Sequence, residues 1–271
     1  MTSYTSELTI NETYLFCQNM PSPIIIVGAA RSGTNMLRDV LVQLPEYSTW
    51  PCDEINYIWR YGNRAHPHDE FTRDMATAEA KSYIQDAVKH INRKQPDTTV
   101  IEKTCATSLR VGFTDEIFPE ARFLHIYRDG RAVAASAALR WNASLEPRYL
   151  LKKGRFVPKS DLIFYAQRYF KSRLHRLHTG EQRLSTWGPK FKNMDQVFQK
   201  HDLPVACAIQ WMKCVESSRS QLAELSPERV YSLSYEAFIS EPAAELENLC
   251  AFLGTAPVSY THLTLPTICS V

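Results

Sequence analysis

A continuous run of β-branched residues, Ile24 to Val27, leads directly into a glycine-bearing turn, Gly28 to Gly33. The run is too short for a helix, and its lack of polar alternation is typical of a central strand buried on both faces of a parallel sheet. Apolar residues then recur at three- and four-residue spacing from Met36 to Leu44, which predicts a helix that ends at Pro45. The fold is therefore expected to begin with strand, turn and helix.

The same alternation recurs along the chain. Further strands are expected at Thr99 to Ile101, Arg122 to Tyr127 and Arg229 to Leu233. Helices are expected from Ser108 onward and at Gly130 to Trp141, Leu162 to Leu177, Val205 to Leu225 and Pro242 to Leu253. Strands that alternate with helices predict a doubly wound α/β fold, with a mainly parallel central sheet flanked by helices and its site beyond the carboxyl ends of the strands.

Residues 258 to 271 differ in composition from the rest of the chain. They contain no Asp, Glu, Lys or Arg, whereas 22% of the 271 residues are charged. The string resembles translated adaptor read-through at the ends of some metagenome-derived sequences, and the alternative is a final strand rich in Thr and Leu. No repeat or linker divides the chain. We expect one domain at residues 1 to 257, followed by a non-native tail at 258 to 271.

The charge balance and the cysteine spacing limit the kinds of partner that the chain is expected to bind. Thirty-one Lys and Arg against 29 Asp and Glu give a net charge of +2, so no global field favours nucleic acid or an anionic membrane. The longest apolar run, Ile24 to Ala30, is far below the ~18 residues that a membrane span needs. Seven dispersed cysteines without a C-x-x-C indicate neither a disulfide framework nor a metal site. We expect a cytoplasmic protein without nucleic-acid, membrane or metal partners.

The turn between the first strand and helix is P-loop-like. Gly28 and Gly33 have Walker A spacing, which lets backbone N–H groups converge on a phosphate at the helix N-terminus. Thr34-Asn35 replaces the usual Lys-Ser/Thr, and a cation appears earlier, as Arg31. No expected strand ends in a convincing Walker B Asp, so the loop predicts an anion site without magnesium. The alternative is a tight connection with no ligand.

A second motif follows the strand at Arg122 to Tyr127. Arg128 stands at the end of that strand, and Ser136 lies two turns into the next helix on the side that can face back toward it. The guanidinium offers a planar fork for an oxyanion, and the hydroxyl adds a donor. Together they could hold one phosphate.

The strings PIIIVGAARSGTNML and FLHIYRDGRAVAAS together resemble the sulfotransferases that use 3′-phosphoadenylyl sulfate (PAPS). The resemblance extends from Pro23 to about Gly254, includes Tyr235 to Phe238, and is strongest to the bacterial branch related to tyrosylprotein sulfotransferases. It implies that the first loop holds the 5′-phosphosulfate and that the second motif holds the 3′-phosphate. The implied nucleotide-binding residues are Arg31, Ser32, Gly33, Thr34, Asn35, Arg128, Ser136 and Tyr235.

The resemblance also implies where charge is stabilised during transfer. Arg31 matches the basic loop residue of the family, and Lys103 matches a family lysine near the transferred group. Negative charge grows on the bridging oxygen of the leaving bisphosphate, so cations there would lower the barrier. A solvated lysine at a strand end is the alternative interpretation of Lys103.

The acceptor needs a base to remove its proton. Related protein-tyrosine enzymes place a Glu some twenty residues after the loop arginine, which makes Glu54 the preferred base and Asp53 the reserve. A histidine is the competing possibility: His66 and His68 could reach the site if their loop folds over it, whereas His125 lies within a strand and is expected to be a core histidine.

The acceptor itself is not identified by the sequence. Its class could be a small molecule, a glycan or a protein tyrosine, carrying a hydroxyl or an amine. A basic segment at 168 to 183 could form an electrostatic rim or simply a solvated helix face. The aromatic residues near Glu54 could form an acceptor wall or belong to the core; they are Trp50, Tyr57, Trp59 and Tyr61.

Two other functions share parts of this pattern. A P-loop small-molecule kinase has the same strand, loop and helix, although it requires the missing lysine and magnesium ligands. A non-catalytic protein that binds the bisphosphonucleotide would keep Arg128 and Ser136 and lack a competent base.

Overall fold

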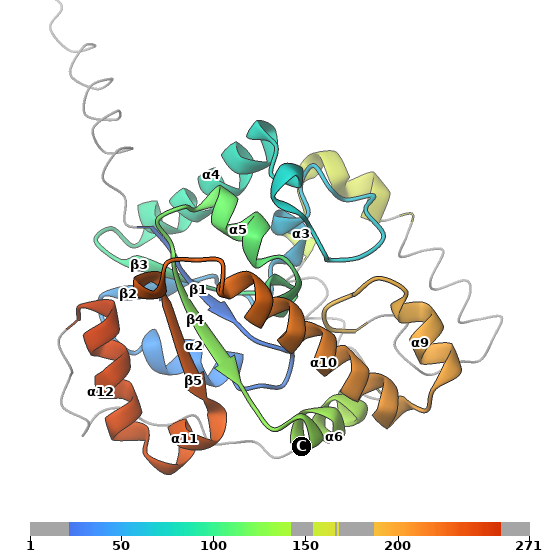
Figure 1. Cartoon of the computed structure of the whole chain (residues 1–271). Coiled ribbons are helices and arrows are strands. Elements are labelled where there is room, and N and C mark those ends of the chain that lie inside the picture. The colour runs from blue at the N-terminus through green and yellow to red at the C-terminus, as the bar shows by residue number, and fades with distance from the viewer. Residues whose placement is uncertain (1–21, 142–153, 166, 168–186, 256–271) are drawn as a thin grey trace, which may run out of the picture.

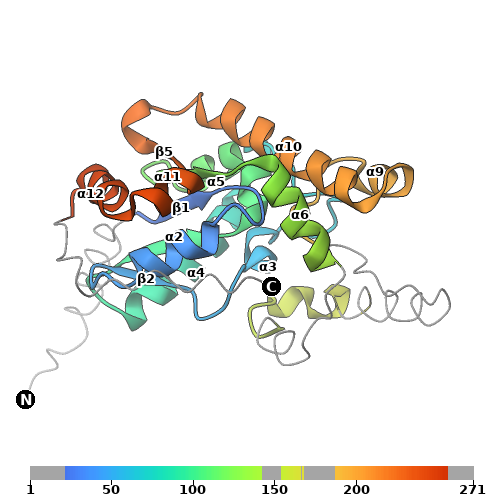
Figure 2. The same cartoon turned by 90° about the horizontal axis from the view of Figure 1, so that it is seen from below.

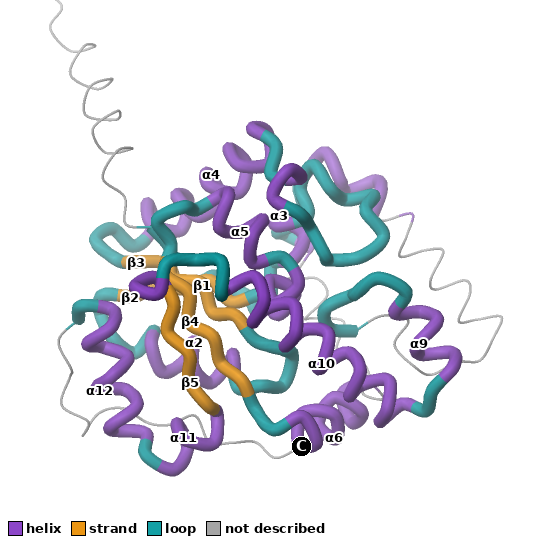
Figure 3. Tube along the Cα trace, in the orientation of Figure 1, coloured by secondary structure: helices purple, strands orange, loops and turns teal. Residues whose placement is uncertain are grey.

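The computed structural model describes residues 22–141, 154–165, 167 and 187–255. A five-stranded sheet forms its centre, with helices around it (Figure 1, Figure 3). The strands are β1 (Ile24–Val27), β2 (Tyr47–Thr49), β3 (Thr99–Lys103), β4 (Arg122–Tyr127) and β5 (Val230–Ser234). The α-helices are α2 (Thr34–Leu41), α3 (Asn56–Trp59), α4 (Ala78–Lys94), α5 (Val111–Ile117), α6 (Gly130–Trp141), α9 (Met194–Lys200), α10 (Leu203–Leu222), α11 (Tyr235–Ser240) and α12 (Pro242–Leu253). Short 3-10 turns occupy Arg73–Met75, Cys105–Leu109, Lys159–Asp161 and Pro227–Arg229.

The sheet is parallel throughout, in the order β2-β3-β1-β4-β5. After β1 the chain passes toward the β2 edge, and after β4 it passes toward the β5 edge. The adjacent carboxyl ends of β1 and β4 are therefore the topological switch point, where open α/β sheets bind their ligands. This confirms the predicted α/β class with a mainly parallel sheet flanked by helices.

Strand β1 is buried on both faces, as its unbroken apolar run predicts. Ile24 and Ile26 pack with α2, α11 and α12 on one face. Ile25 and Val27 pack with α3, α4 and α5 on the other. Helices α6 and α10 pack side by side against a third cluster that also includes α9 (Figure 2). This packed core supports the two loops that follow β1 and β4 at the carboxyl edge of the sheet.

Most predicted elements agree with the structure, and β4 and α6 have the predicted bounds. Helix α2 ends at Leu41, before the expected stop at Pro45. Strand β2 and helix α4 were not predicted, although α4 buries Ala80, Ile84 and Val88 at four-residue spacing and is capped by Thr77. Most of the helix expected at Leu162 to Leu177, the boundary at Pro257 and the tail at 258 to 271 lie outside the described residues.

Gly28 allows β1 and β4 to approach closely. A Cβ atom at this position would lie 2.6 Å from the carbonyl oxygen of Ile126 and 2.9 Å from Cγ2 of Thr34. The first contact is with backbone, so a rotamer change cannot relieve it. We expect Gly28→Ala to lower the free energy of unfolding by about 2–3 kcal/mol, measured by urea denaturation.

Gly154→Ala is the matched control, because a Cβ there would meet nothing within 4 Å. Its unfolding free energy should stay at or above that of the wild type. Equal destabilisation of the two variants would show that close packing at Gly28 is not the cause.

Candidate active site

The loop after β1 has a backbone that favours glycine at one position and forces an arginine into an uncommon conformation. Gly33, before α2, has φ of 93°, and its Cβ would lie 2.4 Å from a ring carbon of Tyr235. Arg31 also has a positive φ, 73°, which is rare for a residue with a side chain. The loop therefore turns sharply, and its second glycine lies directly against Tyr235 of α11.

The hydroxyl groups of this loop differ in their contacts. Ser32 is fully buried, and its Oγ has no hydrogen-bond partner among the described residues. Thr34 Oγ1 lies 3.6 Å from Cys105 Sγ, and Asn35 Nδ2 donates to Asp53 Oδ2 at 3.4 Å. A buried polar atom without a partner is costly. Ser32 Oγ therefore marks a place where a polar ligand would restore a hydrogen bond.

Arg31, Arg128, Ser136 and Tyr235 come together from four parts of the chain. Arg31 Nε donates to Ser136 Oγ at 2.8 Å, and Arg128 Nη1 donates to the Arg31 carbonyl oxygen at 3.2 Å. The Arg128 guanidinium lies 4.1 Å from the centre of the Tyr235 ring. Its Nε is buried without an acceptor among the described residues. The loop after β1 and the motif after β4 thus form one positively charged group, here named the cationic corner, which consists of Arg31, Arg128 and Ser136.

A second group gathers Lys103, Asp53 and Glu54 around one ammonium. Lys103 Nζ lies 2.5 Å from Asp53 Oδ1 and 3.5 Å from Glu54 Oε1, and the lysine side chain is 1% exposed. Burial alone would lower the pKa of Lys103, but the charges of Glu54 and Asp53 raise it above its ordinary value. Lys103 is therefore a fixed cation, and the solvated strand-end lysine considered from the sequence is ruled out.

The two adjacent carboxylates have different surroundings. Asp53 accepts from Lys103, from Arg38 at 2.7 Å and from Asn35. Burial would raise the pKa of Asp53, but Lys103 and Arg38 outweigh it and bring it to about 2. Glu54 meets Lys103 only at the longer distance, and its side chain is 30% exposed. Three donors hold the Asp53 carboxylate, whereas Glu54 pairs with one cation among the described residues; the two side chains are about equally exposed, at 32% and 30%.

The start of α2 lies between the Arg31 group and the Lys103 group. Thr34 contacts Cys105, and Asn35 donates to Asp53. Burial, followed by the nearby charge of Glu54, raises the pKa of the Cys105 thiol well above its usual range. The thiol is therefore protonated at neutral pH. The structure brings all ten predicted site residues to the carboxyl edge of the sheet, in two clusters joined by the start of α2.

The alternative histidines lie elsewhere. His66 Nδ1 lies 3.0 Å from the carbonyl oxygen of His68, and the His66 ring packs against Phe71. His125 is a buried residue of β4 near Ser218 and Ser232, as expected for a core histidine. Their contacts do not include the Lys103 cluster.

The aromatic wall is wrong for two of its four members. Trp59 is fully buried and donates from Nε1 to Glu102 at 2.5 Å, and Trp50 is buried against Phe156. Tyr61 stacks on Tyr83, with ring centres 3.9 Å apart. Tyr57 packs edge-on against Tyr165. Trp50 and Trp59 therefore belong to the core, whereas Tyr57 and Tyr61 are only partly buried. The basic segment at 168 to 183 lies outside the described residues.

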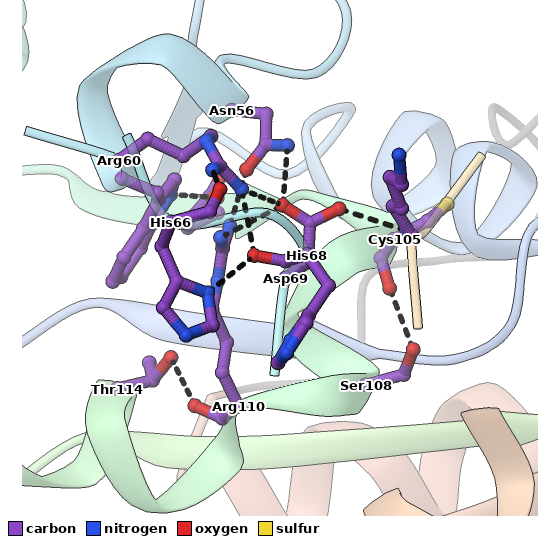
Figure 4. Close-up of polar contacts among 12 residues, drawn as sticks. Asn56, Arg60, His66, His68, Asp69, Cys105, Ser108, Arg110 and Thr114 are labelled. Atoms are coloured by element: carbon purple, nitrogen blue, oxygen red, sulfur yellow. Dashed lines mark hydrogen bonds and ion pairs between the residues drawn. The ribbon is translucent and has the colours of Figure 1, made fainter. Parts of the chain in front are cut away.

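A buried charge cluster, missed from the sequence, supports the carboxylate pair (Figure 4). Arg60 Nη1 lies 2.6 Å from Asp69 Oδ1, and Arg110 Nη1 lies 3.8 Å from the same oxygen. Asn56, two residues after Glu54, donates to Asp69 at 3.2 Å and accepts from Arg110 at 2.7 Å. The cluster fixes the start of α3, and with it the turn that carries Glu54, which has φ of 50°.

The described residues were also compared with the requirements of a metal site and of a membrane-spanning helix. They contain no group of three or more His, Cys, Asp or Glu side chains arranged to hold a metal ion. Across the same ranges, none of the helices combines the length and the apolar character needed to cross a lipid bilayer.

Removing the charge of Asp69 should destabilise the fold. Asp69→Asn keeps the shape but leaves the buried Arg60 and Arg110 cations without their counter-charge. We expect a loss of about 3–5 kcal/mol in unfolding free energy, measured by urea denaturation. Glu216→Gln is the control, because its pair with Lys213 is exposed and should contribute less than about 1 kcal/mol. Similar losses in both variants would contradict the role given to the cluster.

His125 should make stability depend on pH. Burial, with Arg219 nearby, lowers its pKa from 6.5 to about 4, so the unfolded chain binds a proton in this window that the folded chain does not. Folding stability contributed by the neutral ring is complete above pH 6.5 and falls as the pH drops toward 4. His125→Gln should reduce the loss between pH 7 and pH 4.5 by about 2–3 kcal/mol, measured by urea denaturation at both values.

The exposed His90 supplies the control for this measurement. His90→Gln should keep the wild-type dependence on pH. If His125→Gln also keeps it, the buried ring is not its source.

Comparisons with known proteins agree with this geometry. A family model described as the sulfotransferase family matches residues 23–186 and 179–259. The sulfotransferase domain from the curacin biosynthetic pathway has a TM-score of 0.54 at 14% identity, over 89% of this chain and 76% of that chain. Sulfotransferase STF9 from Mycobacterium avium has a TM-score of 0.51 at 11% identity, over 93% and 69%.

The sulfotransferase domain from the Synechococcus PCC 7002 olefin synthase has a TM-score of 0.50 at 16% identity, over 88% of this chain and 75% of that chain. A search of the curated proteins found no match. At these identities the solved structures show the fold alone, which is that of sulfotransferases. The family model matches most of the sequence, and the chain therefore belongs to the sulfotransferase family.

Proposed function

We propose that this sulfotransferase takes its sulfuryl group from PAPS and transfers it to a hydroxyl or amine acceptor. One observation carries the proposal: the cationic corner of Arg31, Arg128 and Ser136 lies at the same sheet edge as the Lys103 and Glu54 pair. Binding of a bisphosphate and removal of an acceptor proton are thereby assigned to neighbouring groups.

The corner offers several donors to a phosphate. Ser32 Oγ and Arg128 Nε are buried and without partners among the described residues. The N-terminus of α2 adds backbone N–H groups and a favourable dipole. In the proposed complex the loop holds the 5′-phosphosulfate, and Arg128 with Ser136 holds the 3′-phosphate. Tyr235, already against Gly33 and Arg128, would flank the nucleoside.

Transfer forms a bond between the acceptor heteroatom and sulfur and breaks the bond from sulfur to the bridging phosphate oxygen. The electron pair of the broken bond stays on the bisphosphate, where Arg31 stabilises the developing charge. Glu54 accepts the proton that the acceptor loses. Lys103 lies 2.5 Å from Asp53 and 3.5 Å from Glu54, so it positions both carboxylates and adds positive charge beside the transferred group.

The environments of the two carboxylates support Glu54 rather than Asp53 as the base. A carboxylate with a pKa near 2 is a weak proton acceptor, and three donors already occupy Asp53. Glu54 is exposed to about the same extent as Asp53, but its carboxylate pairs with one cation rather than two. In this proposal Asp53 positions Lys103, and Glu54 performs the proton transfer.

Binding and turnover should separate in two variants. Arg128→Ala should abolish the thermal stabilisation by adenosine 3′,5′-bisphosphate in magnesium-free buffer, because the 3′-phosphate loses its cation. Glu54→Gln should keep that stabilisation and lower the turnover of PAPS by at least a hundredfold, measured with a panel of phenol, sugar and protein acceptors.

Arg131→Ala is the matched control, because its side chain is 93% exposed and pairs with Asp129. It should keep both binding and turnover. Equal loss of binding in the Arg128 and Glu54 variants would overturn the division of roles. A magnesium-dependent response to ATP in place of the bisphosphate would indicate the kinase alternative.

A further inference from the structure

A cavity lies beside the strands β4 and β5, and Tyr235 is not among its lining residues. It has a volume of about 710 Å³ and runs between α10 and the strands β4 and β5, which are labelled in Figure 1. Arg128 and Tyr127 stand at the end nearest the phosphate loop, and Val230 lies toward the start of β5. A volume of this size is typical of small-molecule sites.

The charged lining of this cavity favours an anion. Arg128 and Arg219 line it, and none of its lining residues is Asp or Glu. Among the described residues, no carboxylate lies within ion-pair distance of either guanidinium. His125, which also lines the cavity, is held neutral by its burial and by Arg219. Arg128 interacts electrostatically with the carboxylate of Glu236, which does not line the cavity. The two arginines make the lining itself positive, and guanidinium groups bind carboxylates and sulfates with paired N–H groups.

The remaining lining favours a flat ring. Tyr127 is unusually exposed for an aromatic residue, at 44%, and Trp211 faces the same cavity. Leu222 and Val230 supply apolar surface. Aromatic walls beside apolar side chains suit a planar ring.

We propose that this cavity is a second ligand site that binds an aromatic anion, a planar ring bearing a sulfate, sulfonate or carboxylate. Arg219 binds the anionic group, and Tyr127 and Trp211 flank the ring. The site goes beyond the proposed transfer reaction, because it lies across β4 from the cluster of Lys103 and Glu54. Arg128 belongs to both regions, so an occupant of the cavity is in contact with the nucleotide site through one side chain.

Calorimetric titration with 2-naphthyl sulfate tests this site. The protein is first saturated with adenosine 3′,5′-bisphosphate, which fills the proposed nucleotide site. We expect one equivalent of naphthyl sulfate to bind, and we expect neutral 2-naphthol to bind at least tenfold more weakly because it lacks the anion. Binding of both compounds with equal affinity would overturn the proposal.

Variants on α10 locate the site. Arg219→Ala should weaken naphthyl sulfate at least tenfold and leave the melting temperature and the bisphosphate affinity unchanged, since this arginine is exposed and makes no contact with the phosphate loop. Lys213→Ala, one and a half turns away and outside the cavity lining, should bind naphthyl sulfate like the wild type.

Unchanged naphthyl sulfate binding in Arg219→Ala would refute the site. So would complete displacement of naphthyl sulfate by the bisphosphate, which would mean that the probe occupies the nucleotide site. Failure of this proposal would leave the bisphosphate affinity of the wild type intact, so it is distinguishable from a failure of the proposed function.

Discussion

The parallel pairing of β1 with β4 is the constraint on which the site depends. Ile26 aligns with Leu124 and Val27 with His125, so β4 continues two residues beyond the end of β1 and brings Arg128 beside the loop that follows β1. Gly28 permits this approach, because any side chain there would strike the backbone of β4. The loop after β1 and Arg128 consequently meet, and Arg128 Nη1 donates to the Arg31 carbonyl oxygen. A cationic corner for an anion follows from strand register alone.

Charge contacts distinguish the two neighbouring carboxylates of the site. The buried Lys103 lies 2.5 Å from Asp53 and 3.5 Å from Glu54. Asp53 is also bound by Arg38 and Asn35. Lys103 and Arg38 lower the pKa of Asp53 to about 2, and these contacts support the proposal that Asp53 positions Lys103 while Glu54 acts as the base. The charge cluster around Asp69 holds the start of α3, two residues after Glu54. Buried charges of this kind cost stability when unpaired, so their pairing favours one position for Glu54, the proposed base.

The sequence was informative where local pattern and chemistry coincide. The β-branched run, the glycine turn and the strand-end arginine follow one another in a recognisable order, and their predicted positions agree with the structure. Strand β2 has only three residues, too few for its pattern to distinguish it from a loop. The contact of Arg110 with Asn56 joins residues 54 positions apart, so no local spacing reveals it. Trp50 and Trp59 were open to two interpretations because aromatic residues serve cores and ligand sites alike, and only their burial decides between them.

The proposed sulfotransfer requires this sheet edge to recognise a 3′,5′-bisphosphate through its side chains and backbone without a metal ion. Calorimetric titration of the wild type with adenosine 3′,5′-bisphosphate and with adenosine 5′-phosphate, both in the presence of a chelator, measures this recognition most directly. We expect the bisphosphate to bind at least tenfold more tightly, because in the proposed complex Arg128 and Ser136 contact the additional phosphate. Equal affinities for the two nucleotides, or binding that appears only with magnesium, would contradict it.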